Sequence, residues 1–183
     1  IQNINLVLVG NWNNSEYGKA LKIKFNSYKN IFLFDPIYNQ REIDLIRGNA
    51  TIYVHGHSAG GTNPSLVEAM HLGLPIIAFK VSYNRTTTEN KALYFSDTSN
   101  LIELLLKTNA SKFATISQNM KTIANRRYTW EIVAKKYSQL FNQALALQTK
   151  SSIYNEINTI DQEYLEKIQL AHLKYTNLFY EKR

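Results

Sequence analysis

Five short apolar runs, the first four separated from one another by segments with helix signals, constrain the fold of this chain most. The runs cover residues 5–9, 31–34, 51–55, 75–79 and 93–95. They are continuously apolar, which is typical of strands buried on both faces of a parallel sheet. Strands that alternate with helices favour an α/β fold, here a Rossmann-like parallel sheet with helices on both faces.

The segments between the runs carry recognisable helix ends. Asparagine or serine N-caps are predicted at Ser15, Asn39 and Asn63. Pro64 suits a first helical turn, and Gly73 suits a helix end. From residue 111 onward apolar residues recur at helical spacing, which predicts helices at 113–125, 130–147 and 154–180.

Composition narrows the class of protein. The 183 residues are 44% hydrophobic and 19% charged, which is typical of a globular domain with a core. The absence of cysteine excludes disulfides and thiolate metal sites. A net charge of +7 favours an anionic partner, but the basic residues are scattered, so we expect no nucleic-acid partner. No apolar run approaches the length of a membrane span.

The loop after the third run is the most informative segment. It contains Gly56, Gly60 and Gly61, and glycines let a backbone approach a ligand closely. The loop leads into the predicted helix at Pro64, whose free N–H groups attract an anion such as a diphosphate. One turn further, Glu68 can accept hydrogen bonds from the vicinal diol of a ribose. An ordinary helix with a solvated glutamate fits the same spacing.

Two motifs resemble a known family. Residues 63–70 and 73–78 read NPSLVEAM and GLPIIA, which resembles the PxxLxEAMxxGxPVI stretch of family 4 glycosyltransferases with the GT-B fold. Residues 128–134, YTWEIVA, with Tyr137 are similar to the FSWExVAxxY ending of that family. The resemblance covers roughly residues 4–145. It implies the C-terminal, donor-binding half of a retaining glycosyltransferase that uses a nucleoside-diphosphate sugar.

A narrower resemblance concerns residues 53–70, YVHGHSAGGTNPSLVEAM. They are similar to the YxHGHxxGGTNPSLxEAM segment of bacterial rhamnosyltransferase-like enzymes, and Asn84-Arg85 with Tyr94-Phe95 matches a later NR…YF stretch. Such enzymes build capsule, cell-wall or O-antigen polysaccharide. The resemblance implies a dTDP- or UDP-sugar such as dTDP-rhamnose as co-substrate, and no other cofactor and no required metal.

The resemblance also assigns roles to residues. It implies Glu68 as the ribose ligand and base contacts at Pro36 and Ile37, where a plain turn is the alternative. For the diphosphate and sugar we expect a set comprising Gly60, Gly61, Thr62, Asn63 and Arg85. The guanidinium of Arg85 suits phosphate oxygens, although a solvated loop charge is an equal alternative. His57, at a strand end, is a candidate contact to donor or acceptor. His55 and His57 have no carboxylate or cysteine near them that could complete a metal site, so we expect no metal there.

One position departs from the family pattern. Many members carry a sugar-binding glutamate eight residues before the ribose glutamate, where this chain has Gly60. We therefore expect backbone N–H groups of Gly61, Thr62 and Asn63 to contact the sugar. A deoxysugar, with fewer hydroxyls to bind, fits this loss.

The resemblance predicts a nucleotide-sugar-binding domain at residues 1–148 and a helical extension at 149–183. We expect the family's diphosphate-binding Arg and Lys, and its N-terminal acceptor domain, to be absent from these residues, which leaves them inactive alone. A glycan or lipid-linked acceptor would bind the N-terminal acceptor domain. No signal-peptide leader is evident, so a cytoplasmic location is expected, with peripheral contact to the inner membrane face as an option.

Two other functions fit parts of the pattern. A nucleotide-sugar epimerase-like GT-B protein would need catalytic carboxylates around the cleft, and the sequence offers none there. A non-catalytic module that binds a nucleotide or a partner would use Glu68 only as scaffold.

Overall fold

The computed structural model describes residues 4–146 and Glu163. The chain divides into two compact units, Ile1–Thr129 and Trp130–Arg183. The predicted extension at 149–183 lies outside the described residues except for Glu163, so its boundary stays a prediction.

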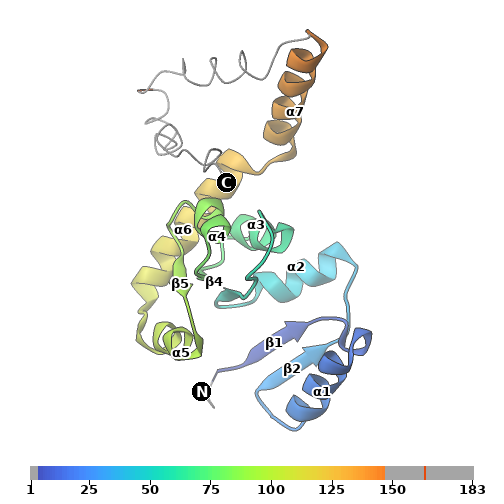
Figure 1. The fold of residues 1–183 in the computed structure, drawn as a ribbon. Coiled ribbons are helices and arrows are strands. Elements are labelled where there is room, and N and C mark those ends of the chain that lie inside the picture. Colours follow the sequence, from blue (N-terminus) through green and yellow to red (C-terminus); the bar gives the residue numbers. More distant parts are fainter. Residues whose placement is uncertain (1–3, 147–162, 164–183) are drawn as a thin grey trace, which may run out of the picture. The chain divides into compact units, whose positions relative to one another are not determined.

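The first unit alternates strands and helices, as Figure 1 shows, and the predicted α/β class is confirmed. Its elements are β1 (Leu6–Val9), η1 (Trp12–Asn14), α1 (Glu16–Phe25), β2 (Ile31–Phe34), α2 (Gln40–Gly48), β3 (Tyr53–His55), α3 (Pro64–His71), β4 (Ile76–Phe79), α4 (Ser82–Thr87), β5 (Leu93–Phe95), α5 (Thr98–Lys107) and α6 (Ala110–Arg127). The described part of the second unit contains α7 (Trp130–Leu145). The predicted helix at 154–180 falls outside the description.

The strands are parallel and form two sheets. One has the order β1-β2 and the other the order β3-β4-β5. In the first, Leu8 pairs with Leu33, and in the second Ile77 pairs with both Val54 and Leu93. The predicted burial on both faces is confirmed for β4, where Ile76, Ile77 and Ala78 are fully buried. It is wrong for β1, whose Leu6, Val7 and Leu8 are exposed. Side chains on the faces of a strand are buried by layers packed above and below the sheet, and the main contacts of β1 among the described residues are with its neighbour β2 in the same sheet.

The core lies around α3, α6 and β4. On α3 the buried residues are Leu66, Ala69 and Met70, which share one helix face through spacings of three and four. They pack with apolar side chains of β4 and α6, namely Leu74, Ile76, Ala78, Ile116, Met120, Ile123 and Ala124. This packing fixes α3, and with it the residues that follow the glycine loop.

The three predicted N-caps are confirmed. Side-chain oxygens of Ser15, Asn39 and Asn63 accept from backbone N–H groups at the start of α1, α2 and α3. Gly73 follows α3 with φ of +70°, a conformation that favours glycine at a helix end. Among residues 4–146 and Glu163, no helix combines the length and apolarity that a membrane span requires.

Candidate functional site

The glycine loop joins β3 to α3. The Asn63 carboxamide oxygen accepts from the Ser65 backbone N–H at 3.0 Å and from the Ser65 hydroxyl at 2.7 Å, which shapes the start of α3. Gly60 has φ of +116°, where a side chain would be strained. A glutamate at this position would therefore need a different backbone, which gives a physical reason for glycine where many family members have glutamate.

The backbone N–H groups of Gly61, Thr62 and Asn63 are unused. None of the three donates a hydrogen bond to another group among the described residues. A Cβ at Gly60 or Gly61 would meet no heavy atom within 4 Å, so the loop backbone is accessible. Free donors beside the N-terminus of α3, at the positive end of its dipole, form an arrangement that suits an anion.

Three aromatic rings form a row that begins on β3 and continues into the loop. Tyr53, His55 and His57 occupy alternate positions, so their side chains share a side. The ring centroids of His55 and His57 are 4.7 Å apart with planes at 20°, and those of Tyr53 and His55 are 6.0 Å apart. The Tyr53 hydroxyl donates to the Ser65 hydroxyl at 3.1 Å. The row of rings therefore leads from the first turn of α3 to His57 in the loop.

His55 is the most buried ring of this row, at 1% exposure. Neither imidazole nitrogen has a hydrogen-bond partner among the described residues. Burial, and secondarily the neighbouring His57, lower the pKa of His55 from 6.5 to about 4. The imidazole is therefore neutral at physiological pH. Sequence reasoning considered His55 only as half of a metal pair, and the described part of the chain holds no group of three or more potential metal ligands.

Glu68, the predicted ribose ligand, lies on α3 and faces α2. Its Oε2 accepts from Nη1 of Arg47 at 2.6 Å. The Glu68 side chain is 39% exposed, so a ligand can reach the carboxylate. Sequence reasoning missed this contact, because Arg47 carried no signal beyond its place near the end of a predicted helix.

Helix α4 was not predicted, and it borders the glycine loop. Asn84 is fully buried, and its amide donates to the carbonyl of His57 at 3.2 Å and to that of Phe79 at 3.0 Å. The Thr87 and Thr62 hydroxyls are 3.4 Å apart. Asn84 thus ties the start of the glycine loop to the end of β4, and Thr87 contacts the loop nearer α3.

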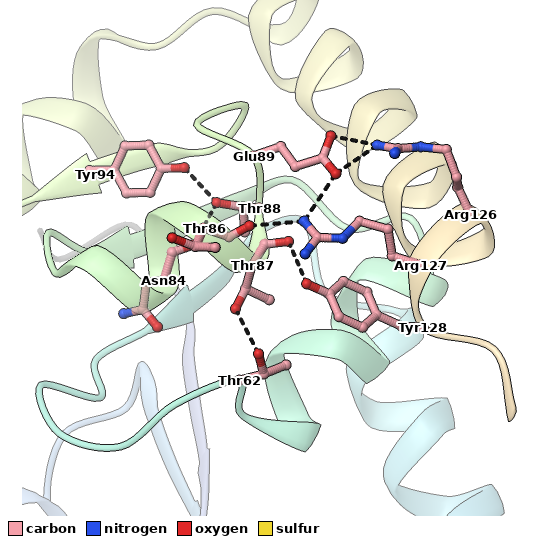
Figure 2. Close-up of polar contacts among 10 residues, drawn as sticks. All are labelled: Thr62, Asn84, Thr86, Thr87, Thr88, Glu89, Tyr94, Arg126, Arg127 and Tyr128. Carbon is pink, nitrogen blue, oxygen red and sulfur yellow. Dashed lines mark hydrogen bonds and ion pairs between the residues drawn. The ribbon is translucent and has the colours of Figure 1, made fainter. Parts of the chain in front are cut away.

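The end of α6 holds the segment after α4, as Figure 2 shows. Arg126 and Arg127 contact the Glu89 carboxylate at 2.6 and 3.0 Å. The Tyr128 hydroxyl donates to the Thr87 carbonyl at 3.1 Å, and burial raises the pKa of Tyr128. Glu89 is nearly buried and has φ of +50°, an uncommon conformation for a side-chain-bearing residue. The segment is therefore fixed between α6 and the glycine loop, and Tyr128, first residue of the second sequence motif, has a structural role.

The other predicted residues, Arg85, Pro36 and Ile37, have no hydrogen bond to the loop donors among the described residues. The Arg85 guanidinium lies 4.9 Å from the Tyr94 ring centroid, so its diphosphate role stays a prediction. Pro36 and Ile37 lie between β2 and α2, and their base contacts are likewise untested. An open hollow follows them along α2, lined by Gln40, Arg41, Asp44 and Leu45. No residue of the predicted set lines it.

Comparisons with known proteins agree on a family and a fold. Residues 1–122 match the family described as glycosyl transferases group 1. Anabaena HepE, solved in complex with UDP-glucose, is similar with 18% identity and a TM-score of 0.64 over 76% of this chain and 41% of that one. Sucrose-phosphate synthase from Thermosynechococcus elongatus is similar with 21% identity and a TM-score of 0.65 over 79% and 39%.

A third similar structure is WaaG, a glycosyltransferase involved in lipopolysaccharide biosynthesis, with 18% identity and a TM-score of 0.57 over 73% of this chain and 37% of that one. This chain therefore spans well under half the length of these proteins, and it has the fold of one half of a GT-B structure. No curated protein sequence matches it.

We predict that Glu89→Gln lowers the free energy of unfolding by about 2–3 kcal/mol, because a neutral amide replaces the nearly buried carboxylate that Arg126 and Arg127 share. Urea denaturation measures the change. The matched control is Glu103→Gln, whose exposed pair with Lys107 contributes about 0.5 kcal/mol or less. Equal losses in both variants would contradict this account of the α4–α6 contact.

We predict that His55 stays neutral down to about pH 4 in the folded protein. The unfolded chain takes up this proton near pH 6.5. The contribution of the neutral His55 to the free energy of unfolding is therefore complete above pH 6.5 and is lost as the pH falls from 6.5 toward about 4. The slope in this window is at most about 1.4 kcal/mol per pH unit. NMR titration of the imidazole measures the pKa directly. A midpoint near 6.5 would show that the ring is not buried as described.

Proposed function

The chain belongs to the group 1 glycosyl transferases, and we propose that it binds the donor of a retaining, nucleotide-sugar-dependent glycosyltransferase. The observation that carries the proposal is the juxtaposition at α3. Three free backbone N–H groups precede the helix, and an exposed, oriented carboxylate lies one turn into it. This order of groups suits a nucleoside diphosphate, with the diphosphate at the loop and the ribose at Glu68.

The chemistry of the reaction places few demands on these residues. Glycosyl transfer passes through an oxocarbenium-like transition state while the nucleoside diphosphate departs. The charge that develops on the departing diphosphate is stabilised by preorganised donors and by the helix dipole. In this proposal Gly61, Thr62 and Asn63 supply those donors, Arg85 supplies positive charge, and His57 contacts the donor or acceptor. The acceptor binds another part of the enzyme.

We further propose a deoxysugar donor, such as dTDP-rhamnose, for synthesis of a bacterial surface polysaccharide at the cytoplasmic side of the membrane. The nucleoside of dTDP is a 2′-deoxyribose, so with this donor Glu68 accepts from the 3′-hydroxyl alone. The residue at position 60 supports this, because a glycine offers the sugar no side-chain hydrogen bond, and a deoxysugar has fewer hydroxyls to satisfy. The relative solved with UDP-glucose is only distantly similar and leaves the choice of sugar open.

Glu68→Ala in the full-length gene product is expected to weaken nucleotide-sugar binding by about tenfold or more, because charge-assisted hydrogen bonds to the ribose are lost. Isothermal titration calorimetry measures the Kd, and Glu103→Ala serves as the control on an exposed helix position. Unchanged affinity would make Glu68 a scaffold residue. Binding without sugar transfer to any acceptor would favour a non-catalytic module.

A donor screen by ligand-induced thermal shift tests the sugar. We expect dTDP-rhamnose to raise the unfolding temperature more than UDP-glucose at equal concentration. A larger shift with UDP-glucose would contradict the deoxysugar proposal and leave nucleotide-sugar binding intact.

A further inference from the structure

Arg47 lies outside the glycine loop, yet it contacts the residue assigned to the ribose. It belongs to the last turn of α2 and directs Nη1 to Glu68 Oε2 at 2.6 Å. The same nitrogen lies 3.8 Å from Oδ1 of Asp44. The Arg47 side chain is only 14% exposed, whereas that of Glu68 is 39% exposed. The guanidinium is therefore held behind the carboxylate, between two acidic groups.

The contact leaves half of the carboxylate available. Oε2 of Glu68 is bonded to Arg47, and Oε1 accepts no hydrogen bond among the described residues. An ionised carboxylate has about four acceptor sites on its two oxygens, so a diol can still donate to it. A glutamate on a helix surface otherwise samples several rotamers, and ordering one costs conformational entropy on binding. Arg47 restricts that freedom before the ligand arrives.

The contact also changes the charge that a ligand meets. A nucleoside diphosphate is an anion, and an unpaired carboxylate one turn from its diphosphate would repel it. The guanidinium offsets the charge of Glu68 while leaving its acceptor capacity. Arg47 has two carboxylates beside it and little exposure, which disfavours a direct contact between its guanidinium and phosphate.

We propose that Arg47 is a positioning residue for nucleotide binding, which orients the Glu68 carboxylate toward the ribose hydroxyls and offsets its charge. The proposal rests on the function proposed above. It implies that the contribution of Arg47 depends on Glu68 and on the number of ribose hydroxyls that the nucleotide offers, which is two in UDP and one in dUDP or dTDP. A ribonucleotide with both hydroxyls should therefore be more sensitive to Arg47 than its 2′-deoxy counterpart, which offers one.

A double-mutant cycle on the full-length protein tests this, with UDP and dUDP as probes and the Kd from calorimetry. Arg47→Gln is expected to weaken UDP binding by about tenfold, and Arg47→Lys by less, since a lysine keeps the charge but loses the planar geometry. In a Glu68→Gln background, Arg47→Gln should change the Kd less than about twofold. The loss for dUDP should be smaller than for UDP.

The matched control is Arg41→Gln on the same helix, which should leave the Kd unchanged, and the urea midpoint of each variant reports folding. Equal weakening by Arg47→Gln in both Glu68 backgrounds would overturn the proposal, as direct contact with the ligand would then explain it. No effect of Arg47→Gln on the Kd of UDP, or on the Kd of dTDP if the parent binds dTDP and not UDP, would also overturn it. If the parent binds no nucleotide, including dTDP, the proposed function itself fails.

Discussion

The packing of α3 against α6 and β4 is the constraint on which the candidate site depends. Leu66, Ala69 and Met70 are fully buried on one side of a helix of only eight residues. Such a short helix has little stability of its own, so tertiary packing must hold it. Because that packing fixes the helix, the groups at its solvent side keep a defined position. These are the cap at Asn63, the free N–H groups before it and the Glu68 carboxylate.

A second layer of polar contacts positions the loop from the other side. Asn84 holds the His57 carbonyl, and the segment that follows α4 is held by the end of α6 through Glu89. The site is thus built from a rigid helix start and a braced loop, with unused backbone donors between them. Preorganised donors of this kind stabilise developing charge without having to reorganise during the reaction.

Much of the fold and of the α3 site could be predicted from the sequence. The features that could not be predicted share one physical cause, which is that contacts between distant residues hold them. The five strands follow from continuous apolar runs, and the cap of α3 from the pair Asn63-Pro64. Helix α4, with the sequence SYNRTT, has no apolar periodicity, since tertiary hydrogen bonds hold it. The contacts of Arg47 with Glu68 and of Arg126 with Glu89 join residues 21 and 37 positions apart. Apolar periodicity and capping residues predict only local structure, so neither of these two ion pairs could be predicted from them.

The roles of Gly61, Thr62, Asn63 and Glu68 in nucleotide binding form the central claim. Its most direct test is an NMR titration of the ¹⁵N-labelled protein with a nucleoside diphosphate, following each backbone amide. The account predicts that the largest shifts occur at Gly61, Thr62 and Asn63, with smaller ones along the first turn of α3. Shifts confined to the hollow lined by Gln40, Arg41, Asp44 and Leu45 would contradict it, and so would the absence of any shift.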